Sequence, residues 1–156
     1  LFYDSNNNLF NPEKWHLELT RWIEFLCIED DFFCPKVVNQ SENLSMGIQF
    51  TDDSTISILN SKWRQKKEVT DVLSFPVIDK ENIFPNVECL ELGDIVISVV
   101  TASRQSKEYQ HDLERELRWL VSHGLLHPLG WDHPDEESLN KMLKAQEQLL
   151  EINVSL

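Results

Sequence analysis

Apolar side chains recur every three or four residues between positions 12 and 28, which is the spacing of one face of an α-helix. The recurring residues are Trp15, Leu19, Trp22, Ile23 and Leu26. The pair Asn11 and Pro12 precedes them, and an asparagine followed by proline is typical of a helix start. The pattern predicts an amphipathic helix over residues 12–28.

A different periodicity follows between residues 44 and 50, where apolar and small or polar residues alternate. Leu44, Met46, Ile48 and Phe50 then lie on one face, as in a half-buried β-strand. Two further β-rich segments cover residues 69–77 and 92–98. We expect the segment that joins them, roughly residues 79–91, to be an irregular loop.

Helical patterns surround and follow these strands. Asp53 is expected to cap a helix with Ile56, Leu59 and Trp63 on one face. After residue 98 the chain changes to helix, and the patterns predict three segments. They cover residues 99–109, 112–127 and 135–151.

This order of elements predicts an α+β fold, with a small mixed sheet of about four strands covered by about five helices. The chain has 156 residues, of which 41% are hydrophobic, and this suits one domain over residues 1–156. No apolar run is long enough for a membrane-spanning helix, and the N-terminal residues show no signal-peptide pattern. We therefore expect a cytoplasmic protein with no membrane partner.

Cysteine usage points in the same direction. The three cysteines, Cys27, Cys34 and Cys89, are odd in number and have no C-x-x-C spacing. This suits a reducing compartment better than a disulfide framework. We expect buried, chemically inert thiols.

The net charge of −13, from 14 basic and 27 acidic residues, weighs against a general affinity for nucleic acid. Four basic residues nevertheless lie within six positions, namely Lys62, Arg64, Lys66 and Lys67. Composition alone leaves two interpretations of this cluster. It is either a local phosphate-binding patch or an ordinary solvated turn.

Histidines are concentrated in one segment, with four of the five between positions 111 and 133. His123 and His127 are four apart and share a helix face, and His133 follows after a turn permitted by Gly130. Three imidazoles at this spacing predict one zinc ion with an open fourth position, as in catalytic sites. His111 and His16 lack the spacing and are interpreted as structural or surface residues.

The same offsets occur in zinc proteases of the type H-E-x-x-H-x-x-G-x-x-H, where the glutamate serves as general base. Here Gly124 occupies the glutamate position. A metallopeptidase is therefore the weaker alternative, because its general base is missing from the expected place.

The segment His123–His133, HGLLHPLGWDH, resembles the hallmark H-G-x-L-H-L-x-G-Y-D-H of the YbeY family of bacterial endoribonucleases. A second group of motifs also resembles this family. It comprises Leu59-Asn60, Trp63-Arg64, TDVLSFP at residues 70–76 and LGDI at residues 92–95. Pro128 and Trp131 replace the usual leucine and tyrosine, and Pro128 predicts that the helix ends or kinks at His127.

The resemblance implies a zinc-dependent endoribonuclease that acts on single-stranded RNA in rRNA maturation, notably at the 3′ end of 16S rRNA, and in ribosome quality control. Its partners would be precursor rRNA and the small ribosomal subunit. His123, His127 and His133 would bind the zinc, and His123 and Arg64 would be catalytic, with the Arg64 guanidinium on the phosphate.

The remaining candidate residues have less specific roles. Lys62, Lys66 and Lys67 are candidate RNA contacts. Asp132 either orients a histidine or a water, or only caps the turn. A function from another class also stays open, namely a zinc-stabilised module that binds RNA or the ribosome without turnover.

Overall fold

The structure is a computed structural model that describes residues 8–78 and 88–153. A 3₁₀ turn, η1, covers Asn8–Phe10. The helices are α1 (Pro12–Ile28), α2 (Lys36–Gln40), α3 (Asp53–Arg64), α4 (Val99–Glu108), α5 (Leu113–Leu126) and α6 (Glu136–Glu151); the strands are β1 (Asn43–Thr51), β2 (Val72–Pro76) and β3 (Cys89–Ser98). None of the described helices is long and apolar enough to cross a membrane.

The sheet has the strand order β1-β3-β2, with β3 parallel to β1 and antiparallel to β2. The α+β class and the mixed sheet are therefore confirmed. Within the described ranges the sheet has three strands, so the prediction of about four was too high. The additional helix is α2, whose five residues are too few to show a helical period.

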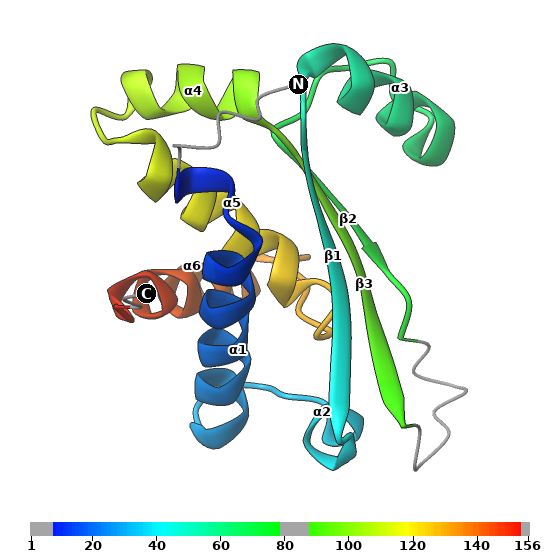
Figure 1. The fold of residues 1–156 in the computed structure, drawn as a ribbon, viewed down its shortest axis with the longest axis vertical. Helices are drawn as coiled ribbons and strands as arrows, with labels where there is room; N and C mark the ends of the chain where they lie inside the picture. The colour runs from blue at the N-terminus through cyan, green and yellow to red at the C-terminus, as the bar shows by residue number, and fades with distance from the viewer. Residues whose placement is uncertain (1–7, 79–87, 154–156) are drawn as a thin grey trace.

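Helices α1, α5 and α6 lie on one side of the sheet (Figure 1). Alternation along β3 divides its side chains between two apolar clusters. Ile95 and Ile97 join the main core with the three helices, whereas Val96 on the other face packs with Ile56 of α3 and Leu73 of β2. Strand β3 is thus covered on both faces near its end, which explains the unbroken apolar run there, at residues 95–97.

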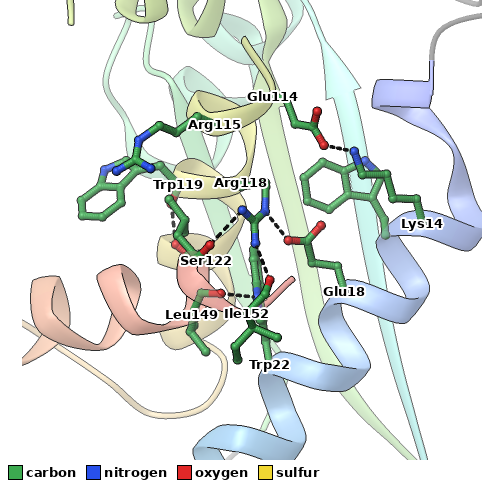
Figure 2. Close-up of polar contacts among 12 residues, drawn as sticks. Lys14, Glu18, Trp22, Glu114, Arg115, Arg118, Trp119, Ser122, Leu149 and Ile152 are labelled. Atoms are coloured by element: carbon green, nitrogen blue, oxygen red, sulfur yellow. Dashed lines mark hydrogen bonds and ion pairs between the residues drawn. The ribbon is translucent and has the colours of Figure 1, made fainter. Parts of the chain in front are cut away.

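Helix α5 is tied to its neighbours by buried polar contacts at Arg118. Its guanidinium pairs with Glu18 of α1 and donates to the carbonyl oxygens of Leu150 and Ile152, at 3.0 Å each (Figure 2). The Trp22 indole N–H donates to the Leu149 carbonyl at 2.9 Å. These bonds hold α1, α5 and the end of α6 together.

The start of α3 and the loop before β3 both differ from their predictions. Asp52, rather than Asp53, caps α3, and its side chain accepts from the Thr55 N–H at 2.8 Å. Asp53 instead accepts hydrogen bonds from Ser98, Thr101 and Arg104, joining α3 to α4. The predicted loop over 79–91 is wrong for residues 89–91, which belong to β3; residues 79–87 lie outside the described ranges.

The cysteine prediction is also wrong. Cys27 and Cys34 form a disulfide between the end of α1 and the segment before α2, and Cys89 is exposed. Neither residue of the pair has a motif that indicates the bond. The chain reverses between them, at residues 29–31, and this reversal brings their Cα atoms to 5.1 Å.

Candidate metal and RNA site

Helix α5 positions the first two histidines. The Asp112 carboxylate caps its start by accepting from the Arg115 N–H at 2.8 Å. The helix ends at Leu126, so the predicted effect of Pro128 is confirmed. His127 nevertheless keeps right-handed helical angles, φ −60° and ψ −52°, and therefore stays on the same helix face as His123.

The turn after α5 returns the chain toward that face. Gly130 has φ 91°, which favours glycine, and its N–H donates to the His127 carbonyl at 2.9 Å. The Trp131 indole N–H then donates to the Phe33 carbonyl at 3.0 Å. Asp132 accepts from the His133 N–H at 2.8 Å, so its carboxylate caps this turn.

The three predicted histidines lie together. One ring nitrogen from each of His123, His127 and His133 forms a group in which all three atoms lie within 4.8 Å of one another. The Nε2 atoms of His123 and His127 are 3.1 Å apart. Ligands of a tetrahedral zinc, each about 2.0–2.1 Å from the ion, lie about 3.4 Å apart, so this pair fits zinc closely. His133 is exposed, and its ring nitrogen completes the group within the 4.8 Å limit.

The surroundings keep the two helical imidazoles neutral. Burial lowers the pKa of His123 most strongly, the hydrogen bond with Gln146 opposes this, and the nearby His133 lowers the pKa further against a smaller opposing effect of Asp71. Burial also lowers the pKa of His127, as do its two histidine neighbours. A neutral imidazole has the free lone pair that a metal requires.

Gly124 lies where α5 packs directly against Ile95 of the sheet. A Cβ atom added there would be 2.7 Å from Cγ2 of Ile95. The Gly124 carbonyl accepts a hydrogen bond from the Ser74 hydroxyl at 2.9 Å. Position 124 therefore faces the packed sheet and has no room for the glutamate of a zinc protease.

Arg64 lies at the end of α3 and donates from Nη2 to the Ser74 carbonyl at 2.8 Å. Ser74 thus links the arginine to the helix that carries the histidines. The other N–H groups of Arg64 have no hydrogen-bond partner among the described residues. They remain available for an anion.

The predicted RNA contacts Lys62, Lys66 and Lys67 are all exposed beside Arg64. Within residues 8–78 and 88–153, none of these lysines pairs with a carboxylate. The sequence predicts only that Trp63 lies on a helix face. Its side chain is 62% exposed, and Nζ of Lys62 lies 5.2 Å from its ring centre. Exposed aromatic rings among cations are typical of surfaces that stack single-stranded bases.

The other two histidines are separate from the cluster, as expected. His111 pairs with Glu116, and His16 is exposed on α1. Sequence reasoning missed Gln146 of α6, whose buried side chain lies behind His123. A polar residue among the apolar positions of α6 was the available signal.

The chain is similar to known proteins over most of its length. The family model described as Endoribonuclease YbeY matches residues 12–153. Endoribonuclease YbeY of Parasynechococcus marenigrum (strain WH8102) is 54% identical over 93% of this chain and 78% of its own length. The protein of the same name from Prochlorococcus marinus (strain NATL2A) is 55% identical over 91% of this chain and 77% of its own length. A solution structure of TM1509 from Thermotoga maritima aligns over 83% of this chain and 82% of that chain, with a TM-score of 0.46 and 24% identity.

Proposed function

Because this chain belongs to the YbeY endoribonuclease family, we propose that it is a zinc-dependent endoribonuclease that cleaves single-stranded RNA. The observation that carries the proposal is the group of three histidine nitrogens within 4.8 Å. Imidazole is a common ligand of zinc. Three imidazoles leave one of the four coordination positions of zinc open, as in catalytic zinc sites. Zinc bound there would lower the pKa of a coordinated water and polarise a phosphoryl oxygen.

The residues around the histidines supply the remaining functions. Arg64, held at Ser74, binds the phosphate and stabilises the charge that develops on it. Lys62, Lys66 and Lys67 contact the RNA backbone on either side of the phosphate that Arg64 binds. Trp63 stacks on a base. Burial lowers the pKa values of His123 and His127, so the lone pairs of these two ligands are available near neutral pH.

The substrate and its cellular setting are the finer part of the proposal. The motifs shared with the family support precursor rRNA as substrate, with processing at the 3′ end of 16S rRNA and a role in ribosome quality control. The small ribosomal subunit is then the assembly on which the enzyme acts. The chain is acidic overall and has one cluster of basic residues. This charge distribution favours RNA that the small ribosomal subunit presents over free RNA of any sequence.

The peptidase alternative is disfavoured by the packing at Gly124, which leaves no space for a general-base side chain. The alternative of a binding module without turnover predicts bound zinc but no cleavage. Cleavage of a single-stranded RNA that spans a 16S 3′ precursor end distinguishes the two. We expect His123→Ala and Arg64→Ala each to reduce cleavage at least 100-fold.

Two controls sharpen this experiment. Arg64→Lys keeps the charge but loses the bidentate geometry, so we expect intermediate activity. Lys144→Ala changes an exposed cation on α6 and should cleave as the wild type does. Equal cleavage by the wild type, His123→Ala and Arg64→Ala would overturn the enzyme proposal.

A further inference from the structure

Gln146 of α6 is 1% exposed, and both ends of its amide are used. Its Nε2 donates to the Trp119 carbonyl at 3.2 Å and to the Ser122 hydroxyl at 3.4 Å. Its Oε1 faces Nδ1 of His123 at 3.4 Å. A buried amide with contacts at both ends makes a hydrogen-bonded link between α6 and the predicted metal site.

The partners of Gln146 determine which end of the amide faces the histidine. The Trp119 carbonyl can only accept, so the amide NH₂ must point toward it. The reversed amide would place its oxygen against the carbonyl oxygen of Trp119 and leave a buried acceptor unsatisfied. Oε1 therefore has to face His123.

Ser122 completes the arrangement from the same helix. Its hydroxyl donates to the Trp119 carbonyl at 2.7 Å, and both residues lie on α5 (Figure 2). With its hydrogen used in that bond, the hydroxyl oxygen accepts from Gln146. The orientation of the amide is thus fixed by two acceptors on α5.

An amide oxygen facing Nδ1 selects one form of the neutral imidazole. Oε1 is an acceptor only, so Nδ1 of His123 must carry the hydrogen and Nε2 must carry the lone pair. Nε2 is the atom that lies 3.1 Å from Nε2 of His127. The nitrogen turned toward the second histidine is therefore the one that can bind a metal.

We propose that Gln146 is a positioning residue that fixes the tautomer and ring orientation of His123 for metal binding. This inference rests on the proposed metal site. Because the amide is neutral, it orients the ring without adding charge beside the site. Removing such a partner of a ligating histidine typically lowers metal affinity about 10- to 100-fold.

The first test uses metal-free protein and needs no catalysis. Long-range ¹H–¹⁵N correlation spectra of histidine-labelled protein at neutral pH report which ring nitrogen carries hydrogen. We expect His123 to be protonated at Nδ1 in the wild type and to shift toward the Nε2-protonated form in Gln146→Leu. An Nε2-protonated His123 in the wild type, or an unchanged tautomer in Gln146→Leu, would overturn the role of Gln146.

The second test measures zinc affinity by competition with a chromophoric chelator. We expect Gln146→Leu to bind zinc about 10- to 100-fold more weakly. Gln146→Glu keeps an acceptor for Nδ1–H but sets its second carboxylate oxygen against the Trp119 carbonyl, so we expect it to recover only part of the affinity. Gln148→Leu, a glutamine two residues away on α6, is the matched control and should bind as the wild type does.

The two tests separate the failure of this inference from that of the proposed function. No zinc binding by the wild type would overturn the metal site, whatever the tautomer. Wild-type affinity in Gln146→Leu would overturn the positioning role and leave the metal site intact.

Discussion

The packing of α5 against β3 depends on the absence of a side chain at position 124. An added Cβ would lie 2.7 Å from Cγ2 of Ile95 and 3.3 Å from two further atoms of that residue. The glycine thus sets the distance between the helix that carries the histidines and the sheet. The sequence showed that a catalytic glutamate was missing there, and the structure supplies the physical reason.

We predict that Gly124→Ala lowers the free energy of unfolding by about 1–3 kcal/mol, because overpacking at Ile95 outweighs the better helix propensity of alanine. Urea denaturation of the metal-free protein measures this. Asn140→Ala, at an exposed position of α6, serves as the control and should change stability little. A Gly124→Ala protein as stable as the wild type would contradict the packing argument.

A second prediction concerns Asp53. Burial raises its pKa, but hydrogen bonds from Ser98, Thr101 and Arg104 outweigh this and hold the pKa below the ordinary value of 3.8. A depressed pKa in the folded state means that the ionised carboxylate stabilises the fold above the unfolded pKa, and that this contribution is lost as the pH falls through the folded pKa.

The free energy of unfolding of Asp53→Asn should therefore lie below that of the wild type at pH 6, with the difference shrinking between about pH 5 and pH 2. Denaturation at a series of pH values tests this, with Glu147→Gln at an exposed site as control. A difference that stays constant with pH would show that the carboxylate charge does not matter.

Among the elements, those with long periodic patterns could be predicted from the sequence. Helix α1 has the predicted bounds, α5 is one residue shorter than predicted at each end, and α6 begins one residue later than predicted and ends where predicted. The short helix α2 could not be predicted because five residues are too few to show a helical period. The Cys27–Cys34 disulfide could not be predicted because it depends on a chain reversal with no periodic pattern. At α3 two adjacent aspartates both suit a cap, and only the contacts with α4 decide between them.

The contact between α1 and α5 depends on a buried ion pair. Glu18 is 2% exposed, and Arg118 is its partner. We predict that Arg118→Leu lowers the free energy of unfolding by about 3–5 kcal/mol, because it leaves a buried carboxylate without its cation.

Thermal or urea denaturation measures the loss at Arg118. The control is Lys141→Met, which breaks an exposed pair with Glu137 whose side chains are 67% and 80% exposed. Because solvent screens such a pair, we expect its loss to change stability little. Equal losses in the two variants would mean that Arg118 contributes no more than a surface ion pair.

At the scale of the whole molecule, the histidine site was predicted because its ligands lie within one short segment. Its supporting residues come from distant parts of the chain: Gln146 lies 23 residues from His123, and Ser74 lies 50 residues from Gly124. Spacing along a sequence carries no information about such contacts. They arise only when α6 and β2 pack against α5.

The net charge of −13 gives a prediction about RNA affinity. If Arg64 and the three lysines beside it make the phosphate contacts, log Kd for a single-stranded RNA should rise with log salt concentration with a slope of about 0.7 per contact, or about 3 in total. Arg64→Ala should reduce the slope by about 0.7. Titrations at several salt concentrations measure both, and a salt-independent affinity would contradict the proposed RNA surface.

The central claim is that His123, His127 and His133 hold one zinc ion on which RNA cleavage depends. Its most direct test adds zinc stepwise to chelator-treated wild-type protein while following cleavage of a single-stranded RNA. We expect cleavage to be absent at first, to rise in proportion to added zinc and to level off at one zinc per chain, with no gain in His133→Ala. Full cleavage by the metal-free protein, or an equal gain in His133→Ala, would contradict it.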